Sequence, residues 1–185
     1  MKRLAQKGLV SAMASGDLSL VRHCASWTHL PTVRNAAVLM SWLGNGWIYA
    51  LLAGILISTG KRHALWQIVL AGLAIGILHC IYPYIKHVIQ RPRPFIEDSS
   101  LSPLLPVIDQ YSFPSGHLMT LTGSLVPMVM FIPTSLPYAF LLWFVMAWAR
   151  IASAHHYLSD VLGGSILGIA VSYPLSFLFK AWMLL

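Results

Sequence analysis

The pentapeptide Phe113-Pro114-Ser115-Gly116-His117 stands where a polar, proline-rich loop gives way to a run of apolar residues. Pro114 suits the first position of a helix, because its missing N–H group is not needed there. The first backbone N–H groups of a helix have no partner within it, and the helix dipole makes this end positive. Ser115 and Gly116 therefore predict an anion-binding site at the start of an apolar helix.

The composition of the chain is that of a membrane protein. Of its 185 residues, 57% are hydrophobic and only 9% are charged, whereas soluble domains have about a quarter charged residues. The net charge of +7 indicates contact with anionic lipid headgroups, and no nucleic-acid-binding motif accompanies it. Cys24 and Cys80 are too few and too far apart for a zinc site or a disulfide framework. We therefore expect a membrane partner but no metal, cofactor, nucleic acid or obligate protein partner.

Several apolar runs are long enough to be membrane spans. A spanning helix needs roughly 20 mostly apolar residues. Five stretches approach this length, namely 36–59, 64–85, 115–132, 138–154 and 159–184. Gly72 and Gly76, and likewise Gly164 and Gly168, have the spacing that lets helices approach closely. We predict an all-α, integral membrane helical bundle whose transmembrane domain comprises residues 36–185.

The N-terminal segment, residues 1–35, has a different pattern. Charged residues such as Lys7 and Arg22 interrupt its apolar residues, so that no run reaches a full span or resembles a cleavable signal peptide. Two amphipathic helices at the membrane surface fit this pattern, with a break near Gly16 and Asp17 as the cap of the second. We expect five spans in total, or six if this segment also crosses the membrane.

Three groups of polar residues fall at the ends of these spans. They are Lys86, Arg91 and Arg93 after the second span, the pentapeptide at the start of the third, and Arg150, His156 and Asp160 after the fourth. Five consecutive spans place all three groups on the same side of the membrane. A single charge at a helix end can extend to the interface, but this concentration of cations, histidines and an aspartate indicates a site for phosphate.

Phosphoryl transfer needs positive charge around the phosphate oxygens and a nucleophile in line with the leaving group. Lys86, Arg93 and Arg150 can supply the charge. His156 and Asp160 are four residues apart, so on a helical turn they share a face. The aspartate can then fix the imidazole as a nucleophile toward phosphorus.

His117 is the candidate general acid, because the departing oxygen must receive a proton. His155 competes with its neighbour His156 for the role of nucleophile. The spacing to Asp160 favours His156, since His155 would point elsewhere. No cluster of His, Asp and Cys resembles a metal site, so we expect activity without a metal.

Together these motifs resemble the three-part signature of the type-2 phosphatidic acid phosphatase and vanadium haloperoxidase superfamily. The matching residues are Lys86-(six residues)-Arg93-Pro94, Pro114-Ser115-Gly116-His117 and Arg150-(five residues)-His156-(three residues)-Asp160. The resemblance covers roughly residues 36–180. It implies a metal-independent membrane phosphatase in which His156 forms a phosphohistidine, Asp160 is its partner and His117 is the acid. It also implies that phosphate is bound by Lys86, Arg93, Ser115, Gly116 and Arg150.

Two features depart from the family pattern. The third motif usually opens with serine before its arginine, and this chain has Ala149 there. The replacement removes one hydroxyl group but none of the expected catalytic residues. Membrane members also often have six spans, which affects the expected topology rather than the chemistry.

The resemblance implies a bacterial lipid phosphatase that hydrolyses a phosphomonoester or diphosphate. The candidate substrates are phosphatidylglycerophosphate, phosphatidic acid and undecaprenyl diphosphate. The alternatives are a lipid phosphotransferase with the same phosphohistidine and a lipid A phosphatase. A membrane body disfavours a haloperoxidase, and the lack of an internal repeat disfavours a transporter.

The sequence also leads to expectations about which membrane holds the protein and which side of it the site faces. The resemblance implies the bacterial cytoplasmic (inner) membrane, with the site facing the periplasm or the outside. The positive-inside rule favours the opposite orientation, because five basic residues of the N-terminal segment would lie on the site side. Only Lys61, Arg62 and Lys180 mark the other side. Basic residues that bind substrate distort this count, so both orientations stay open.

Overall fold

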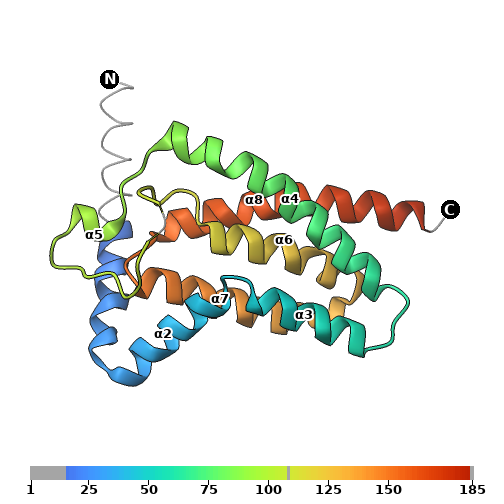
Figure 1. Ribbon diagram of the computed structural model, residues 1–185, viewed down its shortest axis with the longest axis horizontal. Coiled ribbons are helices and arrows are strands. Elements are labelled where there is room, and N and C mark those ends of the chain that lie inside the picture. The colour runs from blue at the N-terminus through green and yellow to red at the C-terminus, as the bar shows by residue number, and fades with distance from the viewer. Residues whose placement is uncertain (1–15, 108, 184–185) are drawn as a thin grey trace.

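The computed structural model describes residues 16–107 and 109–183, and helices dominate this part of the chain, as predicted (Figure 1). Pro92 and Tyr111 form an isolated antiparallel bridge, and the described residues contain no β-strand. The helices are η1 (Trp27–His29), α2 (Pro31–Leu43), α3 (Trp47–Ser58), α4 (Ala64–Ile89), α5 (Pro94–Glu97), α6 (Gly116–Phe131), η2 (Pro133–Ser135), α7 (Leu136–Ala152) and α8 (Leu158–Trp182).

Helix α6 lies at the centre of the bundle, packed against α4, α7 and α8 (Figure 1). Its closest neighbour is α8, because glycines let the two backbones meet. A Cβ atom at Gly164 would clash with the carbonyl oxygen of Ser115, and one at Gly168 would lie 2.8 Å from the carbonyl oxygen of Met119. The predicted close approach at this glycine pair is confirmed. The same prediction is wrong for Gly72 and Gly76, where a Cβ atom would have open space around it.

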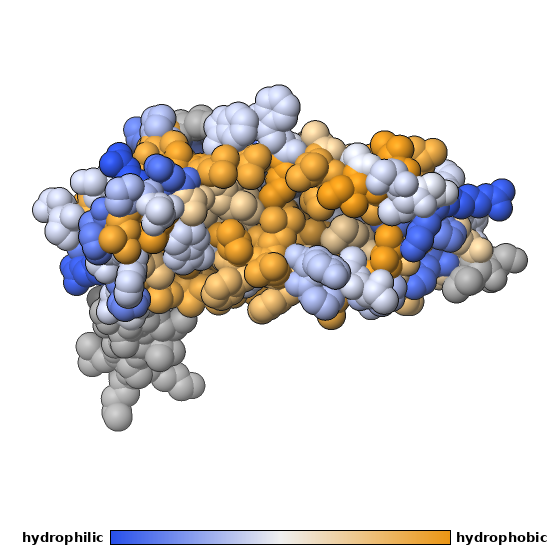
Figure 2. Space-filling model, turned by 90° about the horizontal axis from the view of Figure 1, so that it is seen from below, coloured by the Kyte–Doolittle hydropathy of each residue, from blue (hydrophilic) through white to orange (hydrophobic). Residues whose placement is uncertain are grey.

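The outer faces of the bundle are apolar. Figure 2 shows a hydrophobic band across the middle of one face of the molecule, with hydrophilic residues toward both ends. Leu65 of α4, Phe140 of α7 and Ile166 of α8 are 66%, 62% and 65% exposed. Large apolar side chains exposed over such a wide surface are stable when lipid tails cover them.

Three helical stretches are long and apolar enough to cross a membrane: α4, Pro133–Ala152 and α8. The pair α2 and α3 would be a fourth if the two helices together form one span, and α6 is a shorter apolar helix. These helices indicate an integral membrane protein. The expected total of five spans stays a prediction.

The expected first span, residues 36–59, is not one continuous helix. Helix α2 ends at Leu43, α3 begins at Trp47, and the two are bent by 69°. Gly46 has a φ of 144°, a conformation that favours glycine. Gly44 lies so close to the ring of His117 that a Cβ atom there would be 2.5 Å from its Cδ2 atom. The bend thus places the loop between α2 and α3 against His117.

The N-terminal segment is helical over residues 16–26. The first of the two predicted surface helices lies outside the described residues. Asp17 is not a helix cap, because Gly16 before it is also helical. Its carboxylate instead accepts hydrogen bonds from the backbone and hydroxyl of Ser159 and from Arg91. These contacts attach the N-terminal helix to the start of α8.

Candidate active site

The three polar groups meet at one end of the bundle. A cavity of about 410 Å³ lies there, between the ends of α6 and α7 and the loop that joins α5 to α6. Its walls include Arg93, Gly116, His117, Arg150 and His156. The helix order expected from the sequence therefore brings residues of all three motifs to one place.

Three buried cations lie at this cavity: Arg93 and Arg150 line it, and Lys86 reaches the cavity-lining residue Asp109. Lys86, Arg93 and Arg150 are 5%, 4% and 6% exposed. Arg150 Nη2 lies 2.6 Å from His155 Nδ1, and Arg93 Nη1 donates to the backbone oxygen of His155 over 2.9 Å. Lys86 and Arg93 both donate to the carboxylate of Asp109. Burial of charge is costly unless it is compensated, so this concentration of cations favours a multiply charged anion.

Helix α6 presents its N-terminus to the cavity. It begins at Gly116, so Pro114 precedes the helix by two residues and does not occupy its first position. The backbone N–H of Ser115 donates to the backbone oxygen of Asp160 over 3.0 Å and is not available to an anion. Gly116 lines the cavity, and the first N–H groups of a helix have no partner within it. The expected backbone donor is therefore Gly116 rather than Ser115.

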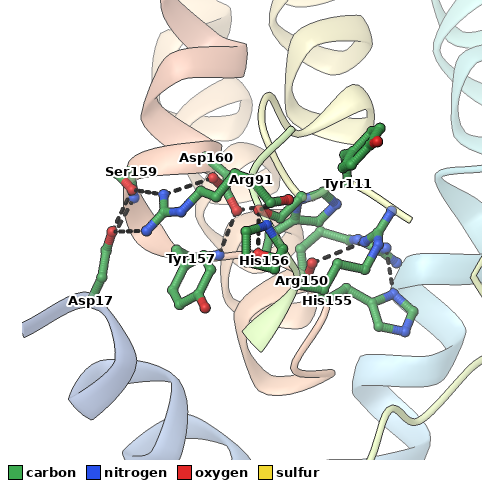
Figure 3. A network of polar contacts seen from close by, with 12 residues as sticks. Asp17, Arg91, Tyr111, Arg150, His155, His156, Tyr157, Ser159 and Asp160 are labelled. Carbon is green, nitrogen blue, oxygen red and sulfur yellow. Dashed lines mark hydrogen bonds and ion pairs between the residues drawn. The ribbon is translucent and has the colours of Figure 1, made fainter. Parts of the chain in front are cut away.

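His156 and Asp160 face each other at the start of α8 (Figure 3). Asp160 is fully buried. Its Oδ1 atom accepts from Arg91 Nη1 over 2.8 Å, and its Oδ2 atom accepts from the backbone N–H of Tyr157 over 2.9 Å. His156 Nδ1 lies 3.7 Å from Asp160 Oδ2 and has no hydrogen-bond partner among the described residues. The carboxylate is thus held in place, and the ring can close on it by a small movement.

His155 is bound on both sides of its ring. Its Nδ1 atom faces Arg150, which can only donate, so this nitrogen must be the acceptor. Its Nε2 atom then carries the proton and donates to the backbone oxygen of Leu105 over 2.9 Å. Neither nitrogen is free to attack a substrate. This arrangement supports His156, and not His155, as the candidate nucleophile.

The surroundings of both histidines keep them neutral. Burial lowers the pKa of His156 well below its usual value, and the charges of Arg150 and Arg93 lower it further. Burial and the charge of Arg150 lower the pKa of His155 to about 3. A neutral imidazole has a lone pair that can act as a nucleophile. The lowered pKa of His156 favours the neutral form that a nucleophile would need.

The bend between α2 and α3 orients His117. His117 Nε2 lies 3.2 Å from the backbone oxygen of Ser41 and 3.1 Å from Asn45 Oδ1. Because a backbone oxygen only accepts, this nitrogen carries a proton. Sequence reasoning missed both partners, although Gly44-Asn45-Gly46 was a visible signal of a helix break.

Arg91 has a different place from the one its sequence position suggested. It does not line the cavity with Arg93, although residues two apart in an extended segment usually share a side. Its guanidinium instead lies behind Asp160, where it also contacts Ser159 and Asp17 and stacks 3.8 Å from the ring centre of Tyr157 (Figure 3). Arg91 thus connects the N-terminal helix to the carboxylate that faces His156.

Two solved structures share this fold. A crystal structure of the first transmembrane PAP2-type phosphatidylglycerolphosphate phosphatase from Bacillus subtilis has a TM-score of 0.64 and 19% sequence identity, covering 92% of this chain and 87% of that chain. A crystal structure of Aquifex aeolicus LpxE has a TM-score of 0.70 and 23% identity, covering 86% of this chain and 93% of that one. A search of curated proteins found no match. At these identities the similarity establishes the fold.

The family is established by the sequence itself. The model of the PAP2 superfamily matches residues 64–183, from the start of α4 to the end of α8. This range is more than half of the chain and contains all three motifs quoted above. It also contains the cavity-lining residues Arg93, His117, Arg150 and His156. The chain therefore belongs to the PAP2 superfamily.

Proposed function

We propose that this protein is a lipid phosphate phosphatase that works through a phosphohistidine on His156. The observation that carries the proposal is the cavity that the buried side chain of His156 lines together with Arg93 and Arg150. An anion is the natural occupant of such a cavity, and a nucleophile already lines its wall. Membership of the PAP2 superfamily supports a phosphatase.

The phosphate group would bind between the cations and the start of α6. The side-chain oxygen of Ser115 and the Nε atom of Arg150 are buried without a partner among the described residues. Buried donors of this kind normally find a partner, and a phosphate oxygen is a strong acceptor for them. Lys86, Arg93 and the N–H of Gly116 would complete the set of phosphate ligands.

In the first step, His156 Nε2 attacks phosphorus while its Nδ1–H donates to Asp160. The P–N bond forms as the bond from phosphorus to the leaving oxygen breaks. His117 would enter this step as the imidazolium, transfer one proton to that oxygen and become neutral. In the second step, neutral His117 takes a proton from water, and the water oxygen attacks phosphorus. The P–N bond breaks as the new P–O bond forms, so that inorganic phosphate leaves and His156 Nε2 regains its lone pair. Three fixed cations stabilise the equatorial oxygens throughout.

Metal independence remains part of the proposal. No group of three His, Cys, Asp or Glu side chains within residues 16–107 and 109–183 is arranged to hold a metal ion. In the mechanism proposed here, Lys86, Arg93 and Arg150 provide the positive charge that a metal would otherwise supply.

The substrate we propose is a lipid with a terminal phosphate. The cavity opens among apolar as well as charged residues, including Trp42, Pro106 and Val107, at the end of helices whose outer faces are apolar. A phosphate headgroup in the cavity would leave its acyl or prenyl chains in the membrane. We propose phosphatidylglycerophosphate as the first lipid to test, because a relative of the same fold carries that activity in its name. Phosphatidic acid, undecaprenyl diphosphate and lipid A phosphates are the other candidates, in an inner membrane with the site facing the periplasm.

Phosphate release from each of these lipids in detergent tests the proposal. His156→Ala is the inactive reference, and His79→Ala is the matched control, because His79 is an exposed histidine of α4 that contacts its own helix. We expect release with wild type and His79→Ala, no release with His156→Ala, and no loss in EDTA. Release that persists in His156→Ala would contradict the proposed nucleophile. A phosphotransferase would behave differently: an added acceptor lipid would become phosphorylated, and the release of free phosphate would fall.

A further inference from the structure

Asp109 lines the cavity and is the single acidic residue among the described residues that do so. Its Oδ1 atom accepts from Lys86 Nζ over 2.6 Å and from Arg93 Nη2 over 2.9 Å. The backbone oxygen of Asp109 also accepts from Arg93 Nε over 3.0 Å. One carboxylate oxygen therefore binds two of the three cations that the proposed mechanism assigns to phosphate.

The burial of these three groups is unequal. The side chains of Lys86 and Arg93 are 7% and 4% exposed, whereas that of Asp109 is 37% exposed. Asp109 belongs to the loop between α5 and α6, outside any helix. The carboxylate thus covers the cations on their more accessible side, and a loop residue can withdraw without disturbing the bundle.

Asp109 carries a full negative charge at neutral pH. Burial alone would raise the pKa of Asp109, but the hydrogen bond and charge of Lys86, together with those of Arg93, outweigh this effect and lower the pKa below its usual value. A carboxylate resembles one edge of a phosphate group, with two oxygens and a single negative charge. Its position on Lys86 and Arg93 is therefore comparable with that of a monoanionic phosphate.

We propose that Asp109 is an internal competitor for the phosphate position and makes the site selective for dianionic terminal phosphates over monoanionic phosphodiesters. The inference rests on the proposed phosphate site. A dianion gains more from the cations than the carboxylate it displaces, because it carries twice the charge. A phosphodiester carries the same charge as Asp109 and gains nothing by displacing it.

Such selectivity has a use in a bilayer. Phosphodiester headgroups of ordinary phospholipids surround the enzyme at high local concentration, and an uncovered cluster of buried cations would bind them. With Asp109 in place, these lipids must compete with an anion that is tethered at the site and therefore has a high effective concentration. Terminal phosphomonoesters overcome this competition by their second charge.

The opposing interpretation is that Asp109 only positions Lys86 and Arg93. The two interpretations predict effects of opposite sign on anion binding. If Asp109 competes with phosphate, removal of its charge strengthens binding. If Asp109 only holds the cations in place, its removal lets them move and weakens binding.

The test is anion binding to purified protein in detergent at about pH 8.5, where inorganic phosphate is the dianionic probe and dimethyl phosphate the monoanionic probe. Asp109→Asn removes the charge but keeps the shape, and Asp109→Glu keeps the charge. Asp98→Asn is the matched control, because Asp98 lies earlier in the same loop and pairs with Arg22 instead of a cavity residue. Thermal shift at increasing anion concentration gives Kd without any need for turnover, and melting without anion shows that each variant is folded.

We expect Asp109→Asn to bind inorganic phosphate roughly tenfold more tightly and to gain measurable binding of dimethyl phosphate. Asp109→Glu and Asp98→Asn should remain close to wild type. Equal or weaker phosphate binding by a folded Asp109→Asn, with normal binding by wild type, would overturn this inference alone. Phosphate binding by neither wild type nor Asp109→Asn would overturn the proposed site as well.

Discussion

His156 Nδ1 lies 3.7 Å from Asp160 Oδ2, at the point where the loop after α7 enters α8. This distance is longer than a hydrogen bond, yet the two groups face each other inside the protein (Figure 3). The carboxylate is held by Arg91 and by the backbone of Tyr157. The ring is the less constrained of the two groups, because its Nδ1 atom has no hydrogen-bond partner among the described residues. We expect a phosphate at its other nitrogen to favour a shorter contact.

Asp160→Asn should lower kcat/KM by about 10³-fold, because an amide can neither fix the imidazole tautomer nor stabilise the charge that develops on the ring. Steady-state hydrolysis of a lipid phosphate in detergent measures this effect. A variant within tenfold of wild type would show that the carboxylate charge is not needed.

Arg91→Ala should lower kcat by about 10- to 100-fold with a much smaller change in KM, because Arg91 positions Asp160 and does not line the cavity. Arg34→Ala is the control, since Arg34 is an exposed arginine of α2. The separate values of kcat and KM decide the matter. A raised KM with unchanged kcat would instead place Arg91 in contact with the substrate.

Gly164→Ala should destabilise the protein by about 1–3 kcal/mol and reduce activity, because the added methyl group must push α8 away from the carbonyl oxygen of Ser115. Gly76→Ala is the control, since its methyl group would meet open space. Thermal melting in detergent compares the two variants. Equal melting temperatures would contradict the close packing of α6 on α8.

Stability should fall as the pH decreases from 6.5 to 5. Burial lowers the pKa of His155 to about 3 and that of His156 well below its usual value. The unfolded chain therefore binds more protons than the folded one in this range, so stability is complete above pH 6.5 and decreases below it. Each histidine should contribute a loss of up to about 1.4 kcal/mol per pH unit.

Thermal melting between pH 7 and 5 measures this loss. His155→Gln removes one of the titrating groups and should give a shallower dependence on pH than wild type. A wild-type melting temperature that does not change across this range would mean that the two histidines are not buried in their neutral form.

Much of the site could be predicted because its residues sit at the ends of apolar runs. Lys86, His117 and Arg150 lie within a turn of helix ends, and the order of the helices brings these ends together. The spacing between His156 and Asp160 predicted which of two adjacent histidines faces the aspartate. Local spacing determined the His156–Asp160 arrangement, and the alternation of helices determined the rest.

The remainder depends on contacts that sequence spacing does not encode. Asp109 belongs to a loop, and nothing in its neighbours indicates that it faces Lys86. Arg91 and Arg93 are two residues apart, but only Arg93 lines the cavity. The guanidinium of Arg91 lies at Asp160 instead, because Asp17 and Ser159 also bind it there. The bend between α2 and α3 was missed because the three turn residues, 44–46, lie within a long and mostly apolar stretch whose composition predicts a single span.

The most direct test of the proposed chemistry is to trap the covalent intermediate. Wild-type protein is mixed with a lipid carrying a ³²P-labelled terminal phosphate, quenched within milliseconds in alkali, digested and sequenced. We expect label on the peptide that contains His156, stable in alkali and lost in acid as a phosphoramidate should be, and no label in His156→Ala. Label on another residue would contradict the assignment of His156 as the nucleophile. Turnover without label on His156 would also contradict it, when the intermediate forms faster than it is hydrolysed.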